Sequence, residues 1–119
     1  MSDVMTSDFF YSPEYRTQCV KLNARSSAVP RGTIICIEAS PSASQADGTF
    51  DVIGTGTHTR VYGVLLKDVA ASESAQSVDV IVAGHLFKSF VNAVYNTANG
   101  SDLSAAQIAE LRDIGIILK

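Results

Sequence analysis

Two histidines and two cysteines are the side chains in this sequence best suited to metal binding or nucleophilic chemistry. Cys19, Cys36, His58 and His85 follow one another at spacings of 17, 22 and 27 residues. Structural zinc sites usually contain a closely spaced pair of ligands such as C-x-x-C, and this sequence has none. We therefore expect no metal site, with His58 on an exposed strand and His85 at a strand-to-helix junction.

The glycine-rich stretch GTGTHT, residues 54–59, invites comparison with loops that bind phosphate. Those loops lead from a strand into a helix whose N–H groups face the phosphate. Here β-branched residues follow, which favours a turn or a bulge between strands instead.

Carboxylates are the other candidates for acid and base chemistry. They lie in or beside expected turns and strand ends, and no two are paired in sequence, so we predict solvated charges. A catalytic pair brought together by the fold remains open. The sequence thus predicts no catalytic residue and no cofactor; the carboxylates considered are Asp47, Asp51, Asp68, Glu73 and Asp79.

Both cysteines lie in apolar segments, QCVKL and IICIE. Free cysteine is among the most buried residue types, so we expect Cys19 and Cys36 to be buried thiols in a reducing cytosol. A disulfide between neighbouring strands is the alternative, and only geometry decides it.

The length and composition indicate one domain with few candidate partners. The chain has 119 residues, is 46% hydrophobic and 18% charged, and carries a formal net charge of −3. No basic cluster is present, which disfavours binding to a nucleic-acid backbone. The longest uncharged apolar run, residues 61–66, is too short to cross a membrane, and the first residues do not have the pattern of an export signal.

The hydrophobic pattern predicts a mainly β domain with one or two short helices near the C-terminus. Apolar residues recur at helical spacing from Leu86 to Tyr95. Further on, Ser104 and Gln107 form a capping-box pattern, and Gly115 suits the left-handed residue that ends a helix. Strands are expected at 17–22, 33–39, 49–53, 57–69 (one strand or two) and 78–83, with residues 116–118 returning to the core.

The N-terminal residues 1–16 have no sustained period, and we interpret them as an arm that precedes the domain at 17–119. Their aromatic side chains are too numerous for a freely solvated tail. They either dock on a partner or fold back on their own core. The residues are Phe9, Phe10, Tyr11 and Tyr15.

The order of segments from PRGTIICIE through DGTF, VYGVLLKDVAA and VDVIVAGHL to AAQIAELRDIGIILK resembles the bacteriophage head decoration protein family, to which the lambda decoration protein belongs. A strand beginning at a glycine and ending in Asp-Val, a later strand ending in Gly, and Leu-Arg followed by Gly-Ile carry the resemblance. The matching residues are Gly63 to Leu66, Asp68 and Val69, Gly84, Leu111 and Arg112, and Gly115 and Ile116.

The resemblance implies a β-clip or β-tulip-like fold and a structural role without catalysis. The protein would bind the major capsid protein on the outer surface of the expanded head, as a homotrimer at three-fold or quasi-three-fold sites, after assembly in the host cytoplasm. The aromatic residues of the arm would then be the candidate capsid-binding residues: Phe9, Phe10, Tyr11 and Tyr15. The protein would act as a cement protein that stabilises the capsid against the pressure of packaged DNA, with no nucleic acid or membrane as partner.

Two alternatives accompany this hypothesis. One is a small β-rich ligand-binding protein or enzyme with GTGTHT and His58 near a pocket. The other is a different minor virion component, such as a head fibre base. Fold alone does not separate them.

Overall fold

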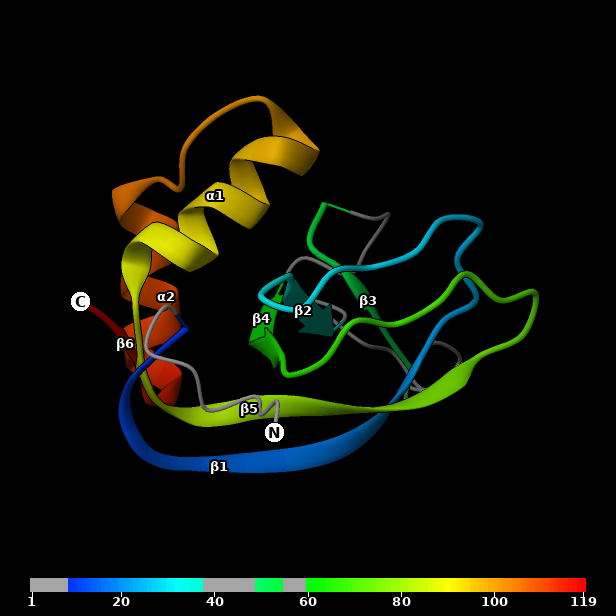
Figure 1. Ribbon diagram of the computed structural model, residues 1–119, viewed down its shortest axis with the longest axis horizontal. Helices are drawn as coiled ribbons and strands as arrows, with labels where there is room; N and C mark the ends of the chain where they lie inside the picture. The colour runs from blue at the N-terminus through cyan, green and yellow to red at the C-terminus, as the bar shows by residue number, and fades with distance from the viewer. Residues whose placement is uncertain (1–8, 38–48, 55–59) are drawn as a thin grey trace.

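The computed structural model describes residues 9–37, 49–54 and 60–119. Six strands in these residues form one sheet, most of which closes into a barrel (Figure 1). The expected fold class is confirmed: the domain is mainly β, with a closed barrel and two short helices near the C-terminus. The elements are β1 (Phe10–Leu22), β2 (Ile34–Ile37), β3 (Thr49–Val52), β4 (Arg60–Leu65), β5 (Gln76–Leu86), α1 (Lys88–Asn99), α2 (Ala105–Ile114) and β6 (Ile116–Leu118).

The strand order explains how the barrel closes. The order is β1-β3-β2-β4-β5-β6, and β1 also pairs with β5, so the first five strands form a ring. The β1–β5 pair is antiparallel and runs from Phe10 opposite Leu86 to Leu22 opposite Gln76. β6 adds to β5 in parallel, opposite residues 84–86. β1 and β5 are the longest strands. The start of β1 and the end of β5 extend past the barrel toward the helices (Figure 1).

β1 changes the expected domain boundary. A strand was predicted over residues 17–22, and the structure begins it at Phe10, so the boundary between residues 16 and 17 falls inside one strand. Pro13 and the lack of a period hid this strand, because its first part is held by pairing with β5 rather than by a local pattern. Residues 1–8 of the expected arm lie outside the described residues.

The C-terminal helices follow the local signals closely. The Ser104 hydroxyl accepts a hydrogen bond from the Gln107 N–H at 3.1 Å, and the Ser104 N–H donates to Gln107 Oε1 at 2.8 Å. This is the predicted capping box, and Gly115 ends α2 at φ 107° as predicted. α1 begins two residues later than Leu86, because Leu86 is still paired in β5.

Two hydrophobic cores fill the domain. The barrel core takes residues from all five barrel strands: Val20, Leu22, Val29, Ile35, Phe50, Leu65, Val78 and Val80. The helical-end core lies between the sheet and the helices: Phe9, Phe10, Ile34, Cys36, Val61, Val64, Leu66, Ile81, Leu86, Val91, Leu103, Leu111, Ile116 and Leu118. Among the described residues, no helix has the length and apolar character needed to span a membrane.

Candidate binding surface

The aromatic residues near the N-terminus do not share one environment. Phe9 and Phe10 are buried in the helical-end core, whereas Tyr15 is half-buried and stacks on Phe10 at a ring distance of 4.5 Å. The two phenylalanines therefore fold back on the protein's own core, which is the second of the two predicted alternatives. They are not available as surface anchors in this conformation.

Phe9 is held from several sides. Its ring lies 4.8 Å from that of Phe90 in α1, and the Arg31 guanidinium lies 4.4 Å from its centroid. The Phe87 N–H donates a 2.9 Å hydrogen bond to the Phe9 carbonyl. A cation over an aromatic ring is attracted by the negative ring face, and more strongly where water is excluded. The start of the described chain is thus fastened to the first turn of α1.

Tyr11 is the exposed member of the set, with 53% of its surface accessible. Alternate side chains of a strand point to opposite faces, so burying Phe10 turns Tyr11 outward. Its ring packs edge-on against Phe87 at 5.4 Å, and the Lys119 ammonium lies 5.3 Å from its centroid. We call Tyr11, Phe87 and Lys119 the aromatic patch. These contacts limit the motion of Tyr11 while leaving much of its ring accessible.

Sequence reasoning did not find Phe87 and Lys119 as neighbours of Tyr11. Phe87 was expected only as part of a helix face, and Lys119 is the last residue. The patch forms because Phe10 pairs with Leu86 and because the Lys119 N–H donates to the Leu86 carbonyl at 2.9 Å. A local sequence pattern cannot predict pairing between residues that lie so far apart in the sequence.

The two cysteines differ in environment. Both thiols are free; Cys36 is buried and Cys19 is exposed on β1, so the expectation of burial is confirmed for Cys36 and wrong for Cys19. Burial, with a smaller contribution from the charge of Glu110, raises the pKa of the Cys36 thiol to about 12. Because the thiolate is the nucleophilic form, Cys36 is an inert core residue near neutral pH.

The candidate metal ligands that lie in the described residues are not grouped together. His85 is half-buried on β5 opposite Ile117 of β6, next to the strand-to-helix junction where it was expected. His58 and most of the GTGTHT stretch lie outside the described residues. Within the parts of the chain that the structure describes, no three His, Cys, Asp or Glu side chains are grouped so as to hold a metal ion.

Asp51 corrects the expectation that the carboxylates are solvated. It is buried, and its Oδ1 accepts 2.7 Å and 2.8 Å contacts from Arg25 Nη1 and the Val52 N–H. The Asn23 amide donates to Oδ2 at 3.3 Å. A buried carboxylate needs such partners, so Asp51 ties the chain after β1 to β3. Asp47 lies outside the described residues.

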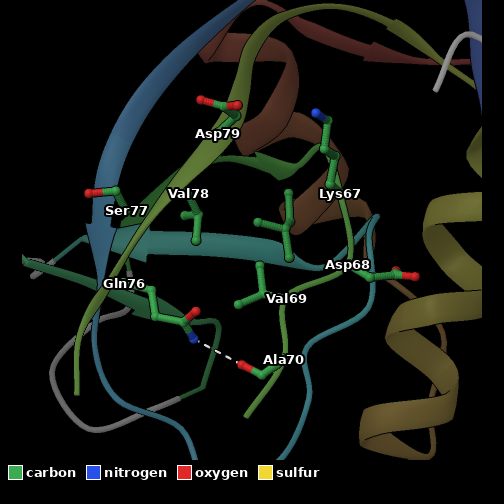
Figure 2. A pocket seen from close by; sticks show the side chains of 9 residues that line it. Lys67, Asp68, Val69, Ala70, Gln76, Ser77, Val78 and Asp79 are labelled. Carbon is green, nitrogen blue, oxygen red and sulfur yellow. Dashed lines mark hydrogen bonds between the residues drawn. The ribbon is translucent and has the colours of Figure 1, made fainter. Parts of the chain in front are cut away.

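A hollow of about 240 Å³ lies where β4 leads into β5, and Figure 2 shows its lining. Val69 and Val78 point toward each other within it, and the Gln76 amide donates to the Ala70 carbonyl at 2.9 Å across one side. The side chains of Lys67 and Asp79 point away from the hollow (Figure 2). Binding sites for small molecules usually present a few convergent polar groups, and these side chains do not converge.

No family model matches the chain, and neither a curated protein nor a solved structure matches it.

Proposed function

We propose that this chain is a structural virion protein that binds the outer surface of an expanded phage head and stabilises it against the pressure of packaged DNA. The resemblance to head decoration proteins motivates the proposal. The observation that carries the binding part is the aromatic patch, where an exposed tyrosine is braced by a second ring and a lysine. Large aromatic side chains with few rotatable bonds recur as anchors in protein interfaces.

Several of the residues behind the resemblance have structural roles in this fold. A Cβ on Gly63 would lie 2.4 Å from the Ile81 carbonyl oxygen, so this glycine permits β4 and β5 to approach. Asp68 accepts a 2.7 Å hydrogen bond from the Arg31 N–H, and Leu111 is fully buried. Part of the pattern that carries the resemblance therefore consists of residues that stabilise this fold.

The proposed partner is the major capsid protein, and the proposed assembly is a homotrimer. The aromatic patch lies at the end of the molecule where the described chain both begins and ends (Figure 1). One such patch on each subunit would give three linked contacts per trimer. After the first contact forms, the others become intramolecular, so modest individual contacts add up to firm attachment.

The direct test is co-sedimentation with empty heads of the source phage, comparing expanded with unexpanded heads. We expect the wild-type protein to bind expanded heads and the Tyr11→Ala variant to bind at least about 30-fold more weakly, which corresponds to about 2 kcal/mol. Tyr11→Phe keeps the ring and serves as the matched control. Failure of the wild type to bind would overturn the proposal, and equal binding by Tyr11→Ala would remove the patch from it.

The buried phenylalanines determine how an arm deletion should be made. Removing residues 1–15 would take Phe9 and Phe10 out of the helical-end core and disturb the fold. A deletion of residues 1–8 retains both. If that segment docks on the capsid, the shortened chain will keep its unfolding midpoint and lose affinity for expanded heads.

A further inference from the structure

Within the part of the chain that the structure describes, one edge of β1 is unpaired over part of its length. β3 lies on the side of β1 away from β5 and pairs only with Lys21 and Leu22. Among the described residues, no other strand pairs with this edge. The four residues Arg16, Thr17, Gln18 and Cys19 are all exposed, so this part of β1 is accessible from both faces. Figure 1 shows β1 running along the outside of the molecule beside β5.

The backbone direction along this edge follows from the strand register. The Leu66 N–H donates to the Asp79 carbonyl at 3.1 Å, so the backbone groups of Asp79 face β4. Asp79 is opposite Cys19, and in an antiparallel pair residues alternate between hydrogen-bonded and non-hydrogen-bonded positions. The N–H and C=O groups of Cys19 therefore point away from β5.

Thr17 has the same orientation as Cys19. The β1–β5 register has no irregularity between Thr17 and Leu22, so residues two apart point the same way. At the far end of this run, the Asn23 N–H donates to the Phe50 carbonyl of β3 at 2.8 Å, which independently places the odd-numbered backbone groups on the outer side. Thr17 and Cys19 thus present two N–H donors and two C=O acceptors in line along the edge.

Exposed strand edges are templates for pairing, and natural proteins usually protect them with charge, proline or a covering segment. Pro13 lies near the start of β1 and removes one donor there, and β3 covers the other end. Between them the sequence Thr17-Gln18-Cys19 is uncharged. The unprotected part is therefore short and bounded on both sides.

We propose that this edge pairs with the same edge of a second copy of the chain, antiparallel about a two-fold axis at Gln18. This register places Thr17 opposite Cys19 of the other copy, which allows four backbone hydrogen bonds. Arg16 then faces Val20, so no like charges oppose each other. A register centred one residue earlier, at Thr17, puts the two Arg16 side chains on a close diagonal, and we disfavour it for that reason.

The contact extends only over residues 16–20, which β3 leaves uncovered. It is a two-fold contact, so it is separate from the three-fold contact of the proposed trimer and goes beyond the proposed function. Where both exist, β1 pairing would join neighbouring trimers.

Cysteine cross-linking tests the pairing and its register. In the Thr17→Cys variant, the new thiol lies opposite the native Cys19 of the other copy, at a distance that a disulfide can span. We expect mild oxidation to give a species of twice the chain mass with a peptide that joins residue 17 to residue 19. Ser101→Cys, an exposed position between the helices, is the control and should cross-link no faster than chance collision allows. A 17–17 or 19–19 peptide would overturn the register, and no excess over the control would overturn the pairing.

A second pair of variants tests the same contact without cysteine chemistry. Thr17→Pro removes a backbone donor that points away from β5, and proline is tolerated at such edge positions. We expect Thr17→Pro to lower the native mass at least two-fold, while Thr17→Ala keeps it. A native mass that Thr17→Pro does not change would overturn the proposal. Thr17→Pro protein that still binds expanded heads would leave the proposed function intact, so the two proposals fail separately.

Discussion

The barrel core and the helical-end core differ in how far apart in the sequence their parts lie. The described barrel-core residues run from Val20 to Val80, and neighbouring strands supply most of them. The helical-end core contains residues from Phe9 to Leu118, so its members come from almost the full length of the described chain. β5 connects the two, because Val80 faces the barrel core and Ile81 faces the helical end. Residues near both ends of the described chain are therefore part of the core, including two aromatic residues of the predicted N-terminal arm.

The largest effect should come from removing a terminal aromatic residue. Phe9→Ala deletes a fully buried ring and its contacts with Phe90 and Arg31, so we expect a loss of about 3–5 kcal/mol in the free energy of unfolding. Phe50→Ala in the barrel core is the matched comparison and should fall in the same range. Urea denaturation followed by circular dichroism measures both. A cost below about 1 kcal/mol for Phe9→Ala would show that the chain start is only loosely attached.

Gly63→Ala tests the barrel side of the comparison. A Cβ at this position would lie 2.4 Å from both the Ile81 carbonyl oxygen and Val80 Cγ1, so β4 and β5 would have to separate. We expect a cost of about 1–3 kcal/mol, in line with overpacking elsewhere. Thermal unfolding of the variant gives the value.

Gly54→Ala is a useful control for that substitution. Gly54 has a positive φ of 88°, but a Cβ added there would meet nothing within 4 Å, so its cost comes from the backbone conformation alone, about 1–2 kcal/mol. If the two variants lose equal stability and Gly63→Ala keeps the native β4–β5 amide protection, then close strand approach is not what requires glycine at position 63.

The sequence predicted well what is determined locally. The capping box of Ser104 with Gln107 and the left-handed Gly115 are short-range signals, and α2 follows them. The buried run at Ile34–Ile37 likewise became β2. Each of these depends on residues within a few positions of one another, so periodicity and cap chemistry are enough to find it.

What the sequence did not predict depends on pairing over long distances. Tyr11 joined the aromatic patch because β1 pairs with β5, and Asp51 is buried because Arg25, 26 residues away, neutralises it. Cys19 lies in an apolar segment and is nevertheless exposed, because side chains alternate along β1 and its neighbour Val20 is the one that faces the barrel core. Hydrophobic pattern gives no information on which strand will be a neighbour.

The smallest effect concerns Cys36, whose side chain lies in the helical-end core while its neighbour Ile35 lies in the barrel core. Burial raises the pKa of this thiol from 9.0 to about 12. Between these values the unfolded chain releases the proton and the folded chain keeps it. The contribution to stability is therefore fully present below pH 9 and is lost as the pH rises toward 12. We expect a loss of about 0.8 kcal/mol by pH 9.5. The measurement is the free energy of unfolding at pH 8 and pH 9.5 for the wild type and for Cys36→Ala, which lacks the thiol and so corrects for every other pH-dependent contribution. The wild type should lose more than the variant over this interval. Equal losses would mean that the Cys36 thiol ionises in the folded chain as readily as in the unfolded chain, and hence that the helical-end core around it admits water.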